Sequence, residues 1–165
     1  MARSRKFHFK KYSIVEGNLQ IVLDMSRFEE QFQRAQYELD GEIMNSMIPF
    51  MPMVTASFID ATRSASAAVQ GSGKVYAAYG PQGRFLYEGM GMVGVQSGSP
   101  RARDGEKKVL VSQYGGQTNA KEFLTYTKAA HPQAQSNWFD AAKGADLKKW
   151  VKKAKEVAGG GTRGR

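Results

Sequence analysis

Residues 26–47, SRFEEQFQRAQYELDGEIMNSM, place an apolar side chain at every third or fourth position. That spacing puts these side chains on one face of a helix of about 22 residues, which is roughly 33 Å long. The face consists of Phe28, Phe32, Ala35, Leu39, Ile43 and Met47. Pro49 follows, and proline neither continues a helix nor favours helix at the residue before it. The sequence therefore predicts one long helix that ends just before Pro49.

A second amphipathic segment spans residues 131–158, HPQAQSNWFDAAKGADLKKWVKKAKEVA, and contains both tryptophans of the chain. We expect Ser136 to cap its helix, and Gly144 interrupts the helical pattern. Large aromatic side chains bury the most apolar area, so we expect structural anchors at Trp138, Phe139 and Trp150. These anchors would pack the helix on a sheet. The opposite face would then point its lysines outward, among them Lys148, Lys149 and Lys152.

Shorter runs rich in β-forming residues lie between the helices. Residues 19–23 (LQIVL) and 74–79 (KVYAAY) are predicted strands, and residues 123–126 are a possible last strand. Residues 54–69 fit either a helix or a strand, because periodicity does not decide between them. Residues 96–107 (QSGSPRARDGEK) have the composition of an exposed loop between two strands.

Together these elements predict an α+β fold. A long N-terminal helix and a C-terminal helix would pack on a small, mostly antiparallel β-sheet, from which a β-hairpin or loop projects. We divide the chain into a basic N-terminal arm (residues 1–18), a single domain (19–158) with a projecting loop region (96–118), and a flexible basic tail (159–165). Tyr76 and Tyr79 are expected to be further structural anchors of the domain.

Positive charge is concentrated at both ends of the chain. The formal net charge is +9 over 165 residues, and residues 1–11 carry five basic groups and no acid. Such ends bind a polyanion in a salt-dependent way, contact an acidic partner protein, or are solvated tails. The candidate contacts to a partner or to DNA, including two arginines of the exposed loop, are Arg3, Arg5, Lys6, Lys10, Lys11, Arg101, Arg103, Lys148, Lys149 and Lys152.

No residue pattern predicts catalysis or a cofactor. Residues 71–74 (GSGK) resemble part of a phosphate-binding loop, but Val75 stands where that loop requires Ser or Thr. His8 and His131 are far apart in the sequence and have no clustered acids beside them, so neither a metal site nor a catalytic triad is predicted. We interpret His131 as a turn residue that makes a local hydrogen bond. The expected class is a protein that is not an enzyme and that binds no cofactor or metal.

The sequence also predicts neither a disulfide nor a membrane-spanning helix. Cysteine is absent from the chain. The most apolar window, residues 47–54, is interrupted by Pro49 and Pro52 and is far shorter than the roughly 20 residues that a spanning helix needs. No apolar run of a signal peptide follows the charged N-terminus. We therefore expect a soluble protein.

Three blocks of sequence, in this order, resemble the minor capsid protein family of tailed bacteriophages, which belongs to the neck, head–tail connector and tail-completion group. The first block is IPFMPMVTASF (residues 48–58), where a helix is followed by a proline-containing turn. The second is the tyrosine-rich block YAAYGPQGRFLYEG (residues 76–89). The third and most specific block is HPQAQSNWFDAAKGADLKKWVKKA (residues 131–154).

The resemblance implies a structural component of the virion neck, assembled in the host cytoplasm. Such proteins form a ring, commonly of about six or twelve copies, between the DNA-filled head and the tail. The implied partners are further copies of the chain, the adjacent neck, connector and tail proteins, and the genomic DNA that passes through the channel, bound without sequence specificity at most.

A second interpretation stays open, in which the chain is a small basic nucleic-acid-binding protein. Phe7, Phe9 and Tyr12 beside the first basic run favour it, because aromatic rings among basic residues suit nucleic-acid binding. The sequence has no helix-turn-helix or zinc-finger pattern that would support direct reading of bases.

Overall fold

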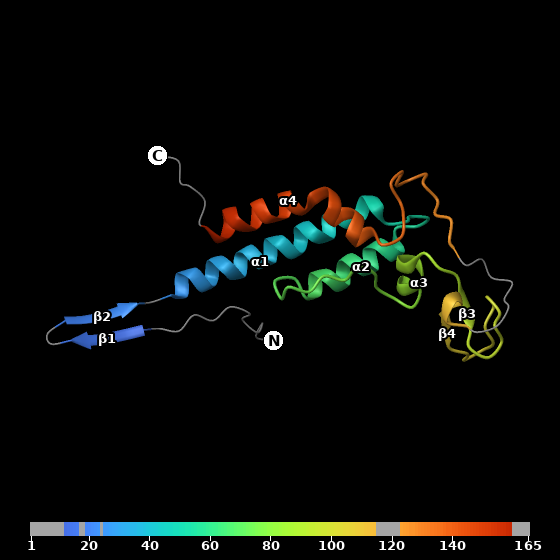
Figure 1. Cartoon of the computed structure of the whole chain (residues 1–165), viewed down its shortest axis with the longest axis horizontal. Coiled ribbons are helices and arrows are strands. Elements are labelled where there is room, and N and C mark those ends of the chain that lie inside the picture. The colour runs from blue at the N-terminus through green and yellow to red at the C-terminus, as the bar shows by residue number, and fades with distance from the viewer. Residues whose placement is uncertain (1–11, 17–18, 24, 115–122, 160–165) are drawn as a thin grey trace.

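Two long helices dominate the computed structural model, which describes residues 12–16, 19–23, 25–114 and 123–159. They are α1 (Ser26–Met47) and α4 (Trp138–Ala158), and they run antiparallel with the most extensive packing of any two elements (Figure 1). Shorter helices and two antiparallel hairpins complete the described part of the chain. The predicted α+β class, with one long helix toward the N-terminus and another toward the C-terminus, is confirmed.

The strands are arranged differently from the expected small sheet beneath both helices. They form two separate hairpins, β1–β2 and β3–β4, while the long helices bury their apolar faces mainly against each other. The physical reason is size. A two-stranded ribbon of three to five residues per strand is too narrow to cover the face of a helix of six turns.

Helix α1 coincides with the predicted helix at both ends. The backbone amides of Phe28 and Glu29 donate to the carbonyl of Met25 at 3.0 and 3.1 Å, which starts the helix at Ser26. After Met47 the chain tightens into the 3-10 turn η1 (Ile48–Phe50), because Pro49 is tolerated only in such a first turn.

The predicted apolar face of α1 is not buried along its whole length. Ala35 and Met47 are buried, whereas Phe28, near the N-terminal end, is 48% exposed. The hydrophobic core therefore lies at the C-terminal half of α1, where Met44, Met47 and Met51 meet α4 and helix α2 (Ser57–Ala68).

Residues 54–69, which the sequence left open, are mainly the helix α2, and the strand predicted for residues 74–79 is wrong. Two backbone amides of residues 74–79 donate to hydroxyl groups on α2, so they do not pair with a neighbouring strand. The amide of Tyr76 donates to the Ser66 hydroxyl at 3.1 Å, and the amide of Tyr79 donates to the Thr62 hydroxyl at 3.2 Å. The segment therefore lies along a helix instead of beside another strand.

The short helix α3 (Gly83–Glu88) follows, and its end is joined to the segment that begins at Phe123. Gly89 terminates α3 with a φ of 70°, a left-handed conformation that favours glycine. The strand predicted for residues 123–126 is wrong, since this segment makes one isolated bridge, between Phe123 and Met90. Two further contacts fix it: the Leu124 amide donates to the carbonyl of Gly89 at 2.8 Å, and the Tyr126 hydroxyl donates to the carbonyl of Leu86.

The hairpin of β3 (Met92–Gly94) and β4 (Lys108–Leu110) has the exposed loop 96–107 at its tip, as predicted. A 3-10 turn, η2 (Val111–Gln113), follows β4. The rest of the predicted loop region, residues 115–118, lies outside the described residues.

The other hairpin joins β1 (Tyr12–Glu16) and β2 (Leu19–Leu23) in an antiparallel register that pairs Tyr12 with Leu23. The strand predicted for residues 19–23 is confirmed. The sequence predicts a basic arm over residues 1–18. Within this range, residues 12–16 form the strand β1, and residues 1–11 and 17–18 lie outside the described part. Figure 1 shows this hairpin beyond the N-terminal end of α1, at the far end of the molecule from β3–β4.

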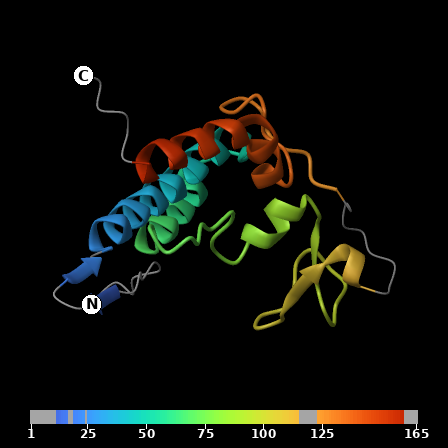
Figure 2. The same cartoon turned by 60° about the vertical axis from the view of Figure 1, so that its left-hand side comes forward.

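Helix α4 continues through Gly144 but bends near it. Along a straight helix, residues 139 and 150 would lie about 16 Å apart. The rings of Phe139 and Trp150 are nevertheless stacked, with centroids 6.2 Å apart. Figure 2 shows the first turns of α4 at an angle to the rest, and glycine is a common cause of such a bend.

Candidate interaction surface

The core is organised around Trp138, whose side chain is completely buried. Its indole Nε1 donates to the carbonyl of Ala77 at 2.7 Å. Its ring meets the rings of Phe58 and Tyr87 edge to face, with centroids 6.0 and 4.9 Å apart. One residue of α4 thus contacts α2, the extended segment 74–79 and α3.

The segment that leads into α4 is attached to the turn after α1. The Nδ1 atom of His131 lies 2.8 Å from the carbonyl oxygen of Met51, and the Gln135 amide donates to the carbonyl of Phe50 at 3.0 Å. The hydrogen bond expected of His131 therefore exists, but it is long-range instead of local.

The N-cap of α4 is Asn137, not the predicted Ser136. Asn137 has a φ of 48°, in the left-handed region, where asparagine is one of the few favoured side chains. Its amide donates to the carbonyl of Tyr87 at 2.8 Å, so the position of the helix start is set by α3.

Trp150 and Lys149 attach the middle of α4 to α1. The Trp150 side chain is buried, and its Nε1 donates to the hydroxyl of Ser46 at 3.0 Å. Beside it, Nζ of Lys149 lies 2.6 Å from Oε1 of Glu42. The hydrogen bond to this carboxylate raises the pKa of Lys149. Lys149 therefore faces α1, in contrast to the outward role predicted for it.

The other predicted anchors occupy different environments. Phe139 is half-buried against Trp150. Tyr76 and Tyr79 are 41% and 50% exposed and pack edge to face on each other, with centroids 5.6 Å apart. Their side chains lie at the surface because the backbone of residues 74–79 is held to α2 through Ser66 and Thr62.

A groove with apolar walls runs between α1 and α4, with a volume of about 380 Å³. Leu147 and Val151 form its outer wall, and each is 45% exposed. Its full lining comprises Leu39, Ile43, Phe139, Lys143, Leu147, Trp150, Val151, Ala154 and Lys155. Leu147 and Val151 also line a second hollow, of about 540 Å³, on the outer side of α4 beside Lys148, Lys152, Lys155 and Glu156. We call the two hollows together the lysine-rimmed groove.

Leu147 and Val151 lie three residues before and one residue after the buried Trp150, yet both are partly exposed. The feature of the sequence that distinguishes Val151 from Trp150 is its angular position around the helix axis. Consecutive residues of a helix are about 100° apart around its axis, so Val151 cannot share the direction of the buried Trp150.

The predicted outward lysines Lys148 and Lys152 are both exposed and stand on this rim. Nζ of Lys152 lies 3.9 Å from Oε1 of Glu156, one helical turn further on. That pair is exposed and loosely spaced, so it holds the lysine only weakly.

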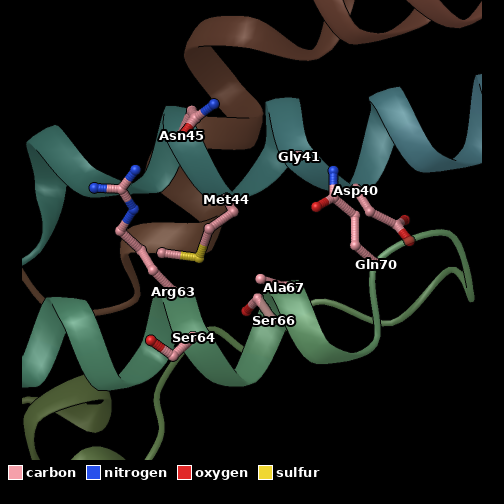
Figure 3. A pocket seen from close by; sticks show the side chains of 9 residues that line it. All are labelled: Asp40, Gly41, Met44, Asn45, Arg63, Ser64, Ser66, Ala67 and Gln70. Atoms are coloured by element: carbon pink, nitrogen blue, oxygen red, sulfur yellow. The ribbon is translucent and has the colours of Figure 1, made fainter.

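A separate pocket of about 360 Å³ lies between α1 and α2 (Figure 3). In Figure 3, Arg63 extends from α2 toward α1 at one end, and Asp40 and Gln70 lie at the other. The Asp40 carboxylate is buried and has protein donors at both of its oxygens. It accepts the amides of Gly71 and Gly73 at 2.7 and 3.0 Å and the side-chain amide of Gln36 at 2.6 Å. This carboxylate therefore closes the end of α2 and is not available to a ligand.

The exposed loop 96–107 is organised by the carboxylate of Glu106. It accepts hydrogen bonds from the backbone amides of Arg103, Ser97 and Gln96, each at 2.7 Å, and from the Ser97 hydroxyl at 2.8 Å. These bonds, led by that from Arg103, lower the pKa of Glu106 to about 2. Gly94 leaves room for the carboxylate, since a side chain there would collide with it.

This ordered loop carries two of the predicted contact residues, Arg101 and Arg103, and both are exposed. The remaining predicted contacts, Arg3, Arg5, Lys6, Lys10 and Lys11, lie outside the described residues.

Among the described residues, no three His, Asp or Glu side chains lie close enough together to hold a metal ion. In the same part of the chain, no helix combines the length and apolarity needed to cross a bilayer. Comparison with protein-family models, with curated proteins and with solved structures gave no match.

Proposed function

We propose that this chain is a structural protein of the neck of a tailed bacteriophage, in the head–tail connector or tail-completion group. In this role it forms a ring that joins the DNA-filled head to the tail, and it is neither an enzyme nor dependent on a cofactor. The proposal combines the sequence resemblance with one observation about the core.

That observation is the convergence of the three resembling blocks on Trp138. The first block supplies Phe58, the second supplies Ala77 and Tyr87, and the third supplies Trp138 itself. Blocks that are separated by long intervening segments thus form one packed unit. The three blocks that carry the resemblance therefore belong to one packed unit, as the parts of a single module would.

The use of the buried polar side chains also supports a structural role. Ser46, Thr62 and Ser66 each bond to an indole or to backbone groups of another segment. Asp40 accepts hydrogen bonds from two backbone amides and a glutamine side chain. These groups fix the fold, and the exposed features, the groove and the loop with its two arginines, suit repeated contacts between subunits.

Deletion of the gene from the phage that encodes it tests the proposal. We expect filled heads and complete tails that remain separate in electron micrographs, with joining restored when purified protein is added. The protein should also be present in mature virions, at a constant copy number relative to the portal. Normal joining without the gene would contradict the proposal.

The nucleic-acid-binding alternative has one observation in its favour, the exposed Lys148 and Lys152 on one side of α4. It predicts tight binding of duplex DNA with an affinity that falls steeply as salt rises. A neck subunit should bind duplex weakly under the same conditions and associate with other virion proteins.

A further inference from the structure

The lysine-rimmed groove combines two properties, apolar walls and a basic rim. Its walls are apolar, and the aliphatic residues Leu147 and Val151 on them are each 45% exposed. Its rim is basic at both hollows, through Lys143 and Lys155 on one and Lys148 and Lys152 on the other. An occupant that fits both properties has apolar side chains flanked by carboxylates.

The chain's own ends do not have this chemistry. Residues 1–11 contain only basic charged groups, and the last six residues contain two arginines and no acid. Both would meet lysines of the same sign. Two acids near the groove, Glu42 and Glu156, already lie beside Lys149 and Lys152.

Nucleic acid also fits poorly. Phosphates would pair with the lysines but gain nothing from Leu147 and Val151, and bases stack on aromatic rings, not on aliphatic side chains. The aromatic groups of the groove, Phe139 and Trp150, are stacked on each other, and Trp150 is buried.

We infer that the lysine-rimmed groove is the docking site for an acidic, amphipathic helix of a neighbouring virion protein. Two apolar side chains one turn apart on that helix contact Leu147 and Val151, and its acidic residues pair with Lys148, Lys152 and Lys155. The identity of the partner as a virion protein rests on the proposed function. The chemistry of the occupant rests on the groove alone.

Charge reversal on the rim gives the first test, in the full-length protein and in the head–tail joining reaction. The variant Lys148→Glu/Lys152→Glu should lower joining at least tenfold. A matched control, Lys128→Glu/Lys153→Glu, makes the same change in net charge at exposed lysines that do not line the groove. It should join within twofold of the unaltered protein. Equal loss in both variants, or no loss in the first, would overturn the inference.

Val151→Glu provides a second variant that keeps the lysines. It places a carboxylate on the apolar wall, at an exposed helical position where the fold tolerates it, and should also lower joining at least tenfold. Circular dichroism of all variants verifies that α4 remains helical. Joining at the normal rate by folded Val151→Glu protein would contradict docking in the groove.

A photoreactive amino acid at position 147 then identifies the occupant. Purified full-length protein is mixed with the purified neck and tail proteins encoded beside its gene, irradiated, and analysed by mass spectrometry. We expect a cross-link to a segment rich in Asp and Glu that disappears in the Lys148→Glu/Lys152→Glu background. A cross-link to a second copy, to added 20-base-pair duplex DNA or to a segment without acids, or no cross-link at all, would refute the inference.

The outcomes separate the inference from the proposed function. If deletion of the gene prevents joining but the groove variants join normally, the function stands and the docking site is wrong. If deletion has no effect on joining, the proposed function fails, and the cross-link at position 147 still reports whether the groove selects an acidic segment.

Discussion

At Trp138, one indole ring contacts three parts of the chain that are distant in sequence. Its Nε1 hydrogen bond to Ala77 spans 61 residues, and its ring lies between those of Phe58 and Tyr87. Such a residue combines a large buried area with a satisfied polar group. Its replacement therefore removes apolar contacts and leaves the half-buried carbonyl of Ala77 without its donor.

For Trp138→Phe we expect the free energy of unfolding to fall by about 2–4 kcal/mol, from the lost volume and the unpaired Ala77 carbonyl. Urea denaturation followed by circular dichroism measures it. Phe123→Leu, at a side chain that is 71% exposed, serves as the control and should change stability by no more than about 0.5 kcal/mol. A loss of less than about 1 kcal/mol in Trp138→Phe would argue against a central role for this ring.

Asp40 is the second residue whose chemistry the structure explains. One carboxylate oxygen accepts both the Gly71 and Gly73 amides, and the other accepts the side chain of Gln36. In Asp40→Asn, one carboxylate oxygen is replaced by an NH₂ group. That group would face either the backbone amides of Gly71 and Gly73 or the side-chain amide of Gln36, all of which are donors. We expect a loss of about 1–3 kcal/mol in the free energy of unfolding, measured in urea. Glu38→Gln, an exposed change on the same helix, should be nearly neutral.

At the scale of elements, the β3–β4 hairpin depends on the charge of Glu106. Its pKa is lowered from 4.5 in the unfolded chain to about 2 in the folded one, so the folded state favours the ionised carboxylate. The contribution of this group to the order of the loop is then fully present above pH 4.5. It is lost progressively as the pH falls toward 2.

We therefore expect the amide NMR signals of Gln96, Ser97 and Arg103 to be constant above about pH 4 and to shift together as the pH falls through about 2, the pKa of Glu106 in the folded protein. In Glu106→Gln this common titration should disappear, while in Glu88→Gln it should persist. A midpoint near 4.5 for these three amides would mean that the carboxylate does not hold the loop.

Gly144 lies near the bend of α4, and its replacement tests whether the bend requires glycine. A methyl group at this position would meet open space, and Gly144 is not among the glycines with positive φ. Alanine should therefore fit the helix and, by its higher propensity, raise the free energy of unfolding by about 0.5–1 kcal/mol. Thermal and urea denaturation of Gly144→Ala check this. A decrease in stability would show that the bend needs the conformational freedom of glycine.

At the scale of the whole molecule, the helical body lies between two hairpins that extend from opposite ends (Figure 1). This arrangement gives neighbours in a closed ring separate surfaces to contact on each side. The sequence resemblance implies six or twelve copies, so the proposed ring should have a mass of about six or twelve times the 18.2 kDa of one chain. Native mass spectrometry of the neck assembly measures it directly, and a mass equal to one chain would contradict the ring.

The sequence predicted those parts of the fold that depend on local periodicity. The helix of residues 26–47, the strand of residues 19–23 and the exposed loop of residues 96–107 each follow from nearby residues. Residues 74–79 have the composition of a strand, but the hydroxyls of Ser66 and Thr62 pair with their backbone. No local pattern reveals that Ser66 and Thr62 face this segment, so the strand prediction failed for a tertiary reason.

The sequence predicted the exposed lysines of the candidate surface, but it did not predict the groove beside them. Lys148 and Lys152 follow from the charge pattern of α4. The groove beside them depends on the bend of α4 and on the angular position of Val151 relative to the buried Trp150. Both require the packing of α4 on α1, which lies far away in the sequence.

The attachment of α4 to α1 has a consequence for synthesis on the ribosome. The hydrogen bonds from Trp150 to Ser46 and between His131 and Met51 join residues that are 104 and 80 positions apart. The core that surrounds Met47 cannot close until residue 150 has left the exit tunnel. During most of translation, the nascent chain therefore carries the apolar face of α1 without its main covering helix, and chaperones that bind exposed apolar helices should retain it until α4 emerges.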